Sequence, residues 1–170
     1  CARLLDLAPA SVSIENRHNE MGIIAVQGPR SPEVMQALGL PADHEYMSAV
    51  KVTYGDVEVI VCRSGYTGER GYEIIAPNGV LLALWEEAIA AGAAPVGLGA
   101  RDTLRLEMGY PLHGHELSDA ITPVEAGLNW AIGWSKDHFE GSEAVKSQKE
   151  ADRKSTRLNS SHTDISRMPS

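Results

Sequence analysis

The sequence predicts an α+β fold with mixed or antiparallel sheets and packed helices. Short apolar runs bounded by Gly, Pro and Asp are typical of strands, and two longer segments carry apolar side chains at helical spacing. Strands and helices follow each other without the strict alternation of a doubly wound sheet, and no internal repeat is present. These observations favour the α+β class.

The first predicted elements are a strand and a helix. The apolar run 22–27 is closed by a Gly-Pro pair, which predicts the end of a strand. Ser31 then suits the N-cap of a helix, Pro32 its first position and Gly39 its end. We therefore expect a helix between Ser31 and Gly39.

Four further strands and two helices are predicted downstream. A Gly-Asp pair separates two β-rich runs, which indicates a tight hairpin, and the strand after it ends at a Pro-Asn-Gly turn. A last strand is predicted in a run that holds two tryptophans. The strands are 49–54, 57–62, 71–76 and 128–134, and the helices are 80–91 and 99–109.

Composition and charge exclude several classes of protein. The chain has 170 residues, 43% hydrophobic and 22% charged, which suits one globular domain or a piece of a larger one. No apolar stretch approaches the ~18 residues that cross a bilayer. The net charge of −8 argues against nucleic acid as the main ligand. Cys1 and Cys62 make no disulfide framework and the sequence shows no signal peptide, so we expect a cytoplasmic protein.

The glycine-rich segment 63–74 is the densest candidate site. Three glycines in seven residues suit a loop that takes unusual backbone conformations or approaches a ligand closely. Glu69, at the exit of the loop, can accept two N–H donors at once, which suits an amino-pyrimidine edge. On spacing alone, a glycine-rich hairpin with Glu69 in solvent is the simpler interpretation.

Arg101 is the second candidate, in the segment 97–109. It falls at a predicted helix start, where a cation opposes the helix dipole. A cation in an unfavourable place suggests a role such as holding a ligand carboxylate. The alternative, slightly favoured on spacing, is a salt bridge on the helix surface, although Asp102 is too close along the chain and Arg105 would repel.

The histidines and the internal cysteine carry weaker signals. His113 and His115, with Glu116, could suggest a metal, but no further His or Cys completes a site and no metal is predicted. Residues 122–125 predict a capped turn with a structural carboxylate. Cys62 falls in a strand, where a small buried hydrophobe is expected, and no Ser, His and Asp set indicates nucleophilic catalysis. The histidines expected on the surface are His18, His44 and His138.

Three ordered segments resemble the aminomethyltransferase family, the T-proteins of the glycine cleavage system. The segments are 65–69 (GYTGE), 100–107 (ARDTLRLE) and 122–128 (TPVEAGL), and residues 25–29 (AVQGP) and 139–141 (FEG) fit the same pattern. Each motif is weak alone, but the ordered set with its spacings is specific. The resemblance covers about residues 1–150 and implies the folate-binding aminomethyltransferase fold.

The resemblance implies a tetrahydrofolate-dependent transferase of one-carbon metabolism and glycine catabolism. Members of the family pass the one-carbon unit of the aminomethyl group on the lipoyl arm of the H-protein to tetrahydrofolate, with release of ammonia. By resemblance, Glu69 matches the carboxylate that binds the amino edge of the pterin, and Arg101 matches the arginine of the folate site. Tyr66 and Arg70 are neighbouring candidates. The expected partner is the H-protein, with no nucleic acid and no membrane.

Both ends of the chain depart from the family pattern. The family's catalytic aspartate lies upstream of Cys1, so the true N-terminus is expected upstream, no catalytic residue is expected here, and the chain alone is expected to be inactive. From Arg153 the sequence turns basic and Ser-rich and resembles translated adapter or vector sequence. The predicted domains are 1–145, a partial folate-binding domain, 146–152, the start of a linker to a missing β-barrel, and 153–170, a non-native tail.

Other functions remain open at this point. The same fold is expected in the folate domains of dimethylglycine and sarcosine oxidases and in a folate-dependent demethylase. A non-catalytic folate-binding protein of the family depends on a Lys-Gly-Cys-Tyr-type motif, whereas Cys62 here lies between Val61 and Arg63. An α+β interaction domain would leave Glu69 and Arg101 without a shared ligand.

Overall fold

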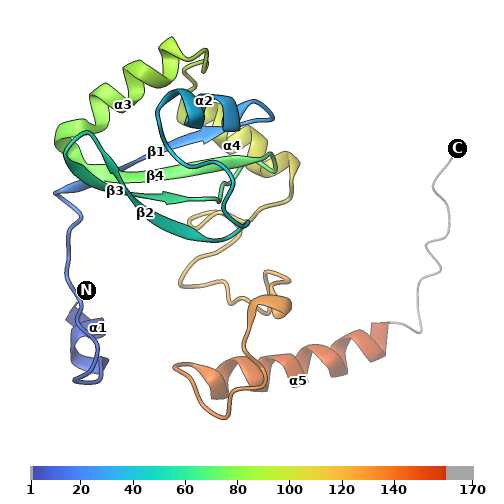
Figure 1. Ribbon diagram of the computed structural model, residues 1–170. Coiled ribbons are helices and arrows are strands. Elements are labelled where there is room, and N and C mark those ends of the chain that lie inside the picture. Colours follow the sequence, from blue (N-terminus) through green and yellow to red (C-terminus); the bar gives the residue numbers. More distant parts are fainter. Residues whose placement is uncertain (1, 160–170) are drawn as a thin grey trace, which may run out of the picture. The chain divides into compact units, whose positions relative to one another are not determined.

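The computed structural model describes residues 2–159, with side chains from Arg3 to Ala151. The chain divides into two compact units, Cys1–Tyr110 and Pro111–Ser170, which are described separately (Figure 1). The first begins with helix α1 (Ala2–Leu7) and holds a sheet with packed helices, so the predicted α+β class is confirmed. Within residues 2–159, no helix is both long and apolar enough to cross a membrane.

A four-stranded antiparallel sheet with the order β1-β4-β3-β2 forms the framework of the first unit. The hairpin is confirmed, because Tyr54 pairs with Val57 around Gly55, whose φ of 57° suits a two-residue turn. The predicted boundaries of all four strands lie within one residue of those observed. The strands are β1 (Met21–Gln27), β2 (Ala49–Tyr54), β3 (Val57–Cys62) and β4 (Gly71–Pro77).

Helices α2 (Ser31–Ala37) and α3 (Asn78–Ala90) cover one face of this sheet (Figure 1). Side chains on a strand alternate between faces, so every second residue of β1 and β4, the strands that α2 and α3 contact, points toward these helices. Gly39 follows the C-cap of α2 and stops the helix as predicted, with a φ of 68°. The fully buried side chains of the core are Met35, Val59, Val61, Tyr72, Ile74 and Leu84.

Two predicted helix starts are wrong. Ser31 is the first residue of α2, whose N-cap is Arg30, and the Ser31 hydroxyl donates to the carbonyl of Arg70 at 3.0 Å. Helix α3 begins at Asn78 directly after β4, so the turn predicted at 77–79 does not separate the two elements. Pro77 remains extended, and its ring makes it a suitable residue to precede the helix.

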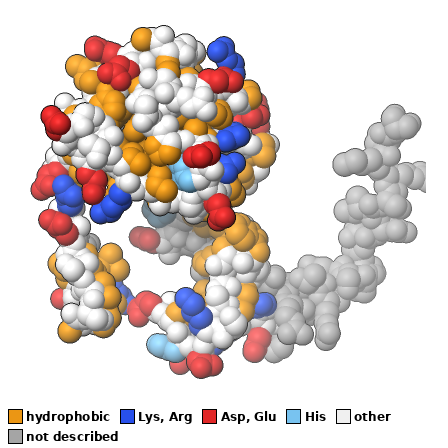
Figure 2. Space-filling view, in the orientation of Figure 1, with side chains coloured by type: hydrophobic (Ala, Val, Ile, Leu, Met, Phe, Trp, Pro, Cys, Tyr) orange, Lys and Arg blue, Asp and Glu red, His pale blue; other side chains and the backbone are white. Residues whose placement is uncertain are grey.

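Helix α4 (Leu98–Glu107) buries a cation and exposes leucines. Arg105 is 3% exposed, while Leu106 is 59% exposed. The buried guanidinium is satisfied, since Nε donates to Asp102 at 2.7 Å and Nη1 to the carbonyl of Tyr110 at 3.1 Å. Figure 2 shows hydrophobic side chains, in orange, among the charged ones on the surface of the sheet-bearing unit.

The second unit holds the short 3₁₀ helix η1 (Asn129–Ala131) and helix α5 (Ser142–Asn159). The strand predicted over 128–134 is wrong, because the segment curls on itself and Trp134 Nε1 donates to the carbonyl of Asn129 at 2.6 Å. Helix α5 runs through residues 146–152 and continues past Arg153, where no regular structure was expected. Residues 160–170 lie outside the described part of the chain, and the non-native origin of 153–170 stays a prediction.

The core can be tested on α3, where one leucine is buried and another is exposed. Leu84 is fully buried and Leu82 is 67% exposed. We expect Leu84→Ala to lower the free energy of unfolding by about 2–5 kcal/mol, because the truncated side chain leaves a cavity. Leu82→Ala should change it by less than about 0.5 kcal/mol. Urea denaturation followed by circular dichroism measures both, and equal effects would contradict this assignment of the core.

Candidate functional site

The candidate site lies on the sheet face opposite α2 and α3. Paired residues of neighbouring strands share a face, so Gln27 lies beside Gly71, and Cys62 lies beside Glu73. Tyr72, between Gly71 and Glu73 on β4, points the other way and is fully buried in the core. The alternation along β4 therefore separates the core from the site.

The glycine-rich loop between β3 and β4 is packed against two protein side chains. Of its three glycines, Gly68 alone has a positive φ, at 77°. A Cβ at Gly65 or Gly71 would collide with the side-chain amide of Gln27, and a Cβ at Gly68 would collide with Met108. Among the described residues, Gln27 and Met108 thus lie close to the loop glycines, and the close approach to a ligand stays a prediction.

Arg101 and Tyr66, two of the three predicted site residues, meet. Arg101 Cζ lies 5.3 Å from the centroid of the Tyr66 ring, within the range of a cation–π interaction. The Tyr66 ring in turn stacks on Tyr110, with centroids 5.8 Å apart and an interplanar angle of 27°. Arg101 lies in the first turn of α4, as predicted, but its ion-pair partner is Glu73 of β4, at 3.6 Å, and not a residue of its own helix.

Glu73 is the acidic centre of this cluster, and sequence reasoning missed it. Its Oε2 accepts a hydrogen bond from Ser64 Oγ at 2.6 Å, while Oε1 faces Arg101. Burial and then the negative charge of Glu73 raise the pKa of the Cys62 thiol. The buried position predicted for Cys62 is wrong, because the side chain is only half-buried and lies beside Glu73 on the face opposite the core. The sequence feature that could have identified Glu73 as a site residue is its acidic side chain in the middle of an apolar strand.

Glu69 is exposed and lines a hollow of about 270 Å³. Tyr110 lines the same hollow and stacks on Tyr66, so it connects Glu69 to the pair formed by Tyr66 and Arg101. The spacing of the sequence did not indicate Tyr110 as a site residue. The other lining residues are Tyr46, Arg63, Ser64, Gly65, Gly68, Arg70 and Gly71.

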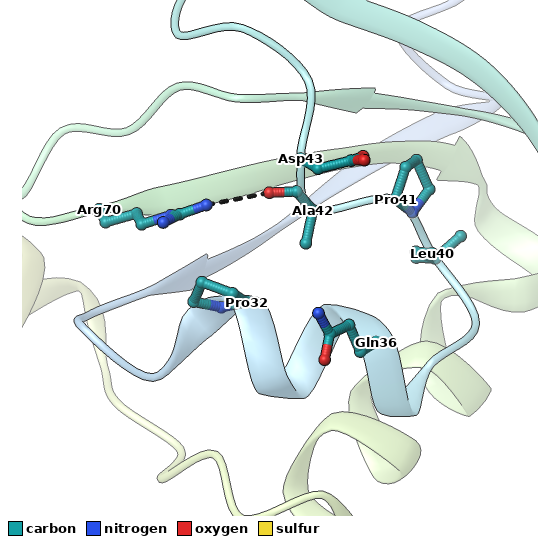
Figure 3. Close-up of a pocket in the computed structure, with 7 residues that line it drawn as sticks. All are labelled: Pro32, Gln36, Leu40, Pro41, Ala42, Asp43 and Arg70. Atoms are coloured by element: carbon teal, nitrogen blue, oxygen red, sulfur yellow. Dashed lines mark hydrogen bonds between the residues drawn. The ribbon is translucent and has the colours of Figure 1, made fainter.

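A second hollow, of about 500 Å³, lies between α2 and the segment that follows it (Figure 3). Arg70 borders both hollows. Its Nη2 donates to the carbonyl of Ala42 at 3.0 Å, and its Nε donates to the hydroxyl of Tyr72 at 3.2 Å. The predicted neighbour Arg70 is therefore anchored to the protein itself, and the other residues of this hollow are Pro32, Gln36, Leu40, Pro41 and Asp43.

The remaining histidines divide between surface and interior. His18 and His138 are exposed, as predicted. The surface position predicted for His44 is wrong, because both of its ring nitrogens are buried and its ring lies 5.9 Å from that of Tyr72. His44 follows the segment whose Ala42 carbonyl accepts a hydrogen bond from the Tyr72 hydroxyl, and this tertiary contact leaves His44 half-buried.

The second unit confirms the capped turn at residues 122–125. The backbone N–H and the hydroxyl of Thr122 donate to Glu125 Oε2 at 2.9 and 2.8 Å, and these hydrogen bonds lower the pKa of Glu125. Glu116 accepts a hydrogen bond from the backbone N–H of Leu112 at 3.0 Å. Within the described part of the chain, no group of three or more His, Cys, Asp or Glu side chains forms a metal site.

Comparisons with known proteins identify the family. The family profile described as the GCVT N-terminal domain matches residues 2–136. An aminomethyltransferase of Frankia alni is 55% identical over 154 residues, which are 88% of this chain and 42% of the relative. One of Mycobacterium avium is 52% identical over 148 residues, which are 85% of this chain and 40% of the relative. The chain belongs to the aminomethyltransferase family.

A solved structure supports the same assignment. The crystal structure of glycine cleavage system aminomethyltransferase T from Bartonella henselae has a TM-score of 0.69 and 36% sequence identity. The match covers 76% of this chain and 37% of that structure. The chain thus spans less than half the length of the relatives that it matches, and the fold predicted from the resemblance is confirmed.

The influence of Glu73 on Cys62 can be measured by alkylation. In a Cys1→Ser background, we expect Glu73→Gln to lower the pH at which Cys62 reacts half-maximally with iodoacetamide. The neutral amide removes one of the two causes that raise the thiol pKa, so more thiolate forms at a given pH. Mass spectrometry follows the reaction. Glu58→Gln, at an exposed position on β3, is the control, and an unchanged midpoint in Glu73→Gln would contradict the coupling.

Proposed function

We propose that this chain is the folate-binding part of an aminomethyltransferase of the glycine cleavage system. The observation that carries the proposal is the stack of Arg101, Tyr66 and Tyr110 beside the hollow that Glu69 lines. A folate has a flat, amino-substituted ring and a carboxylated tail. Aromatic faces, a carboxylate and a cation are complementary to these three features, and membership in the family supports the same ligand.

Each residue has a defined role in the proposed site. The Glu69 carboxylate accepts N–H groups from the amino-pyrimidine edge of the ring, and charged acceptors form the stronger hydrogen bonds. Arg101 binds a carboxylate of the tail. Because a guanidinium has five N–H donors, Arg101 can bind this carboxylate and keep its contact with Glu73. Tyr66 and Tyr110 supply the apolar surface beside these polar groups.

In the proposed reaction, the chain holds the acceptor of the one-carbon unit. The aminomethyl group leaves the sulfur of the lipoyl arm of the H-protein, and its carbon is bonded to two nitrogens of tetrahydrofolate as ammonia departs. The products are 5,10-methylenetetrahydrofolate and the dihydrolipoyl form of the H-protein, so no oxidant or metal is required. We assign no catalytic residue within this chain, and we place the reaction in the cytoplasm.

The proposed ligand contacts predict losses of affinity. Isothermal titration of the full 170-residue chain with 5-formyltetrahydrofolate, a stable folate, measures the dissociation constant. We expect Glu69→Gln and Arg101→Met each to weaken binding about tenfold to a hundredfold, since a hydrogen bond to a charged group contributes roughly 1.5–3 kcal/mol.

Matched variants at the N-terminal end of α2 are the controls for this titration. Glu33→Gln and Arg30→Met make the same chemical changes on exposed side chains that pair with each other at 3.1 Å. Both should bind folate as the unchanged chain does. A folded chain that binds no folate contradicts the proposal, and so does an unchanged affinity in Glu69→Gln and Arg101→Met.

We also expect the chain alone to release no ammonia. The measurement is tetrahydrofolate-dependent ammonia release from aminomethyl-loaded H-protein, with a full-length aminomethyltransferase as the positive control. Binding of folate without turnover is the expected combination, because the chain spans less than half the length of the aminomethyltransferases that it matches. Turnover by the 170-residue chain would show that this assignment is wrong.

A further inference from the structure

Gln27, the last residue of β1, joins three points of the glycine-rich loop. Its Nε2 donates to the carbonyl of Ser64 at 3.3 Å, before the glycines, and to the carbonyl of Tyr72 at 3.1 Å, after them. Its Oε1 accepts from the hydroxyl of Thr67 at 3.2 Å, in the middle of the loop. One side-chain amide therefore bonds to the beginning, the centre and the end of the segment.

The two outer glycines of the loop make room for this amide. A Cβ on Gly65 or on Gly71 would overlap the side-chain amide of Gln27. Neither residue has the positive φ that would require glycine for backbone reasons; among the three loop glycines only Gly68 does. A Cβ at either position would therefore displace the Gln27 amide from its hydrogen bonds with the loop.

An amide is the group that this arrangement requires. The donor end of the side chain meets two carbonyl oxygens and the acceptor end meets a hydroxyl. A carboxylate would set a negative oxygen against both carbonyls, and an apolar side chain would leave them without this donor. A glutamate, although nearly equal in shape, cannot replace Gln27.

We infer that Gln27 is a positioning residue, which holds the loop 64–71 in the shape that presents Tyr66 and Glu69 to the ligand. This inference rests on the proposed folate-binding function. Gln27 does not line the hollow itself, whereas the Ser64 and Gly71 that it contacts do. It acts on the ligand through the loop.

Hydrogen–deuterium exchange of the full chain tests the clamp without any ligand. Gln27→Glu should speed exchange of amides within 64–71, because the carboxylate repels the carbonyls that Gln27 joins. Gln36→Glu makes the same change at an exposed position on α2 and should leave the loop unchanged. Unchanged loop exchange in Gln27→Glu would overturn the inference.

A double substitution separates the clamp from a general loss of stability. Gly71→Ala alone should reduce the stability of the chain, because the new methyl group overlaps the amide. In a Gln27→Ala background, Gly71→Ala should lower the free energy of unfolding by a smaller amount, since the amide is absent. Additive effects of the two substitutions on the free energy of unfolding would overturn the packing on which the inference rests.

Titration with 5-formyltetrahydrofolate tests the positioning role. We expect Gln27→Glu to weaken binding at least tenfold. Ala88→Gly, a buried change on α3 that lowers stability through the helix backbone, should leave affinity unchanged. Faster loop exchange with unchanged affinity would overturn the positioning role. If the unchanged chain binds no folate, the proposed function fails, whereas loop exchange still decides whether Gln27 clamps the loop.

Discussion

The alternation of side chains along β4 is the constraint on which the first unit depends. β4 pairs with β1 on one side and β3 on the other, so every residue of the strand faces either the helix-covered core or the candidate site. Tyr72 and Ile74 enter the core, and Gly71 and Glu73 face the opposite side. A shift by one residue would exchange the two sets. In the shifted register, Glu73 would lie among the apolar side chains of the core. The contacts that hold Glu73 on the site face therefore help to set the register of the sheet.

Electrostatics at the start of α4 link the site to this register. Arg101 lies where the helix dipole is unfavourable to a cation. Glu73 compensates with its charge at 3.6 Å, and the face of Tyr66 adds a second favourable contact. Ser64 donates to the other oxygen of Glu73 and so ties the loop to the same carboxylate. The proposed ligand-binding groups are thus held by a chain of contacts between loop, strand and helix.

Helix α4 is oriented by its polar residues more than by its leucines. Arg105 is buried and bonds to the carbonyl of Tyr110, which helps to fix the residue whose ring stacks on Tyr66. Leu104 and Leu106 are exposed at 38% and 59%. An ordinary amphipathic helix would turn these leucines inward. The helix therefore contributes Arg101 to the site, holds Tyr110 through Arg105 and leaves an apolar surface outside.

The sequence by itself determined the local elements and the residue types of the proposed ligand contacts. Alternating apolar runs and turn residues were enough to predict the four strands and the hairpin, and motif resemblance identified Glu69, Arg101 and Tyr66. Only the tertiary structure decided the contacts of Gln27 and Glu73, because their partners are distant in the sequence or on other elements. The same reason explains the wrong strand at 128–134: an apolar run does not show whether a neighbouring strand is present to accept its hydrogen bonds.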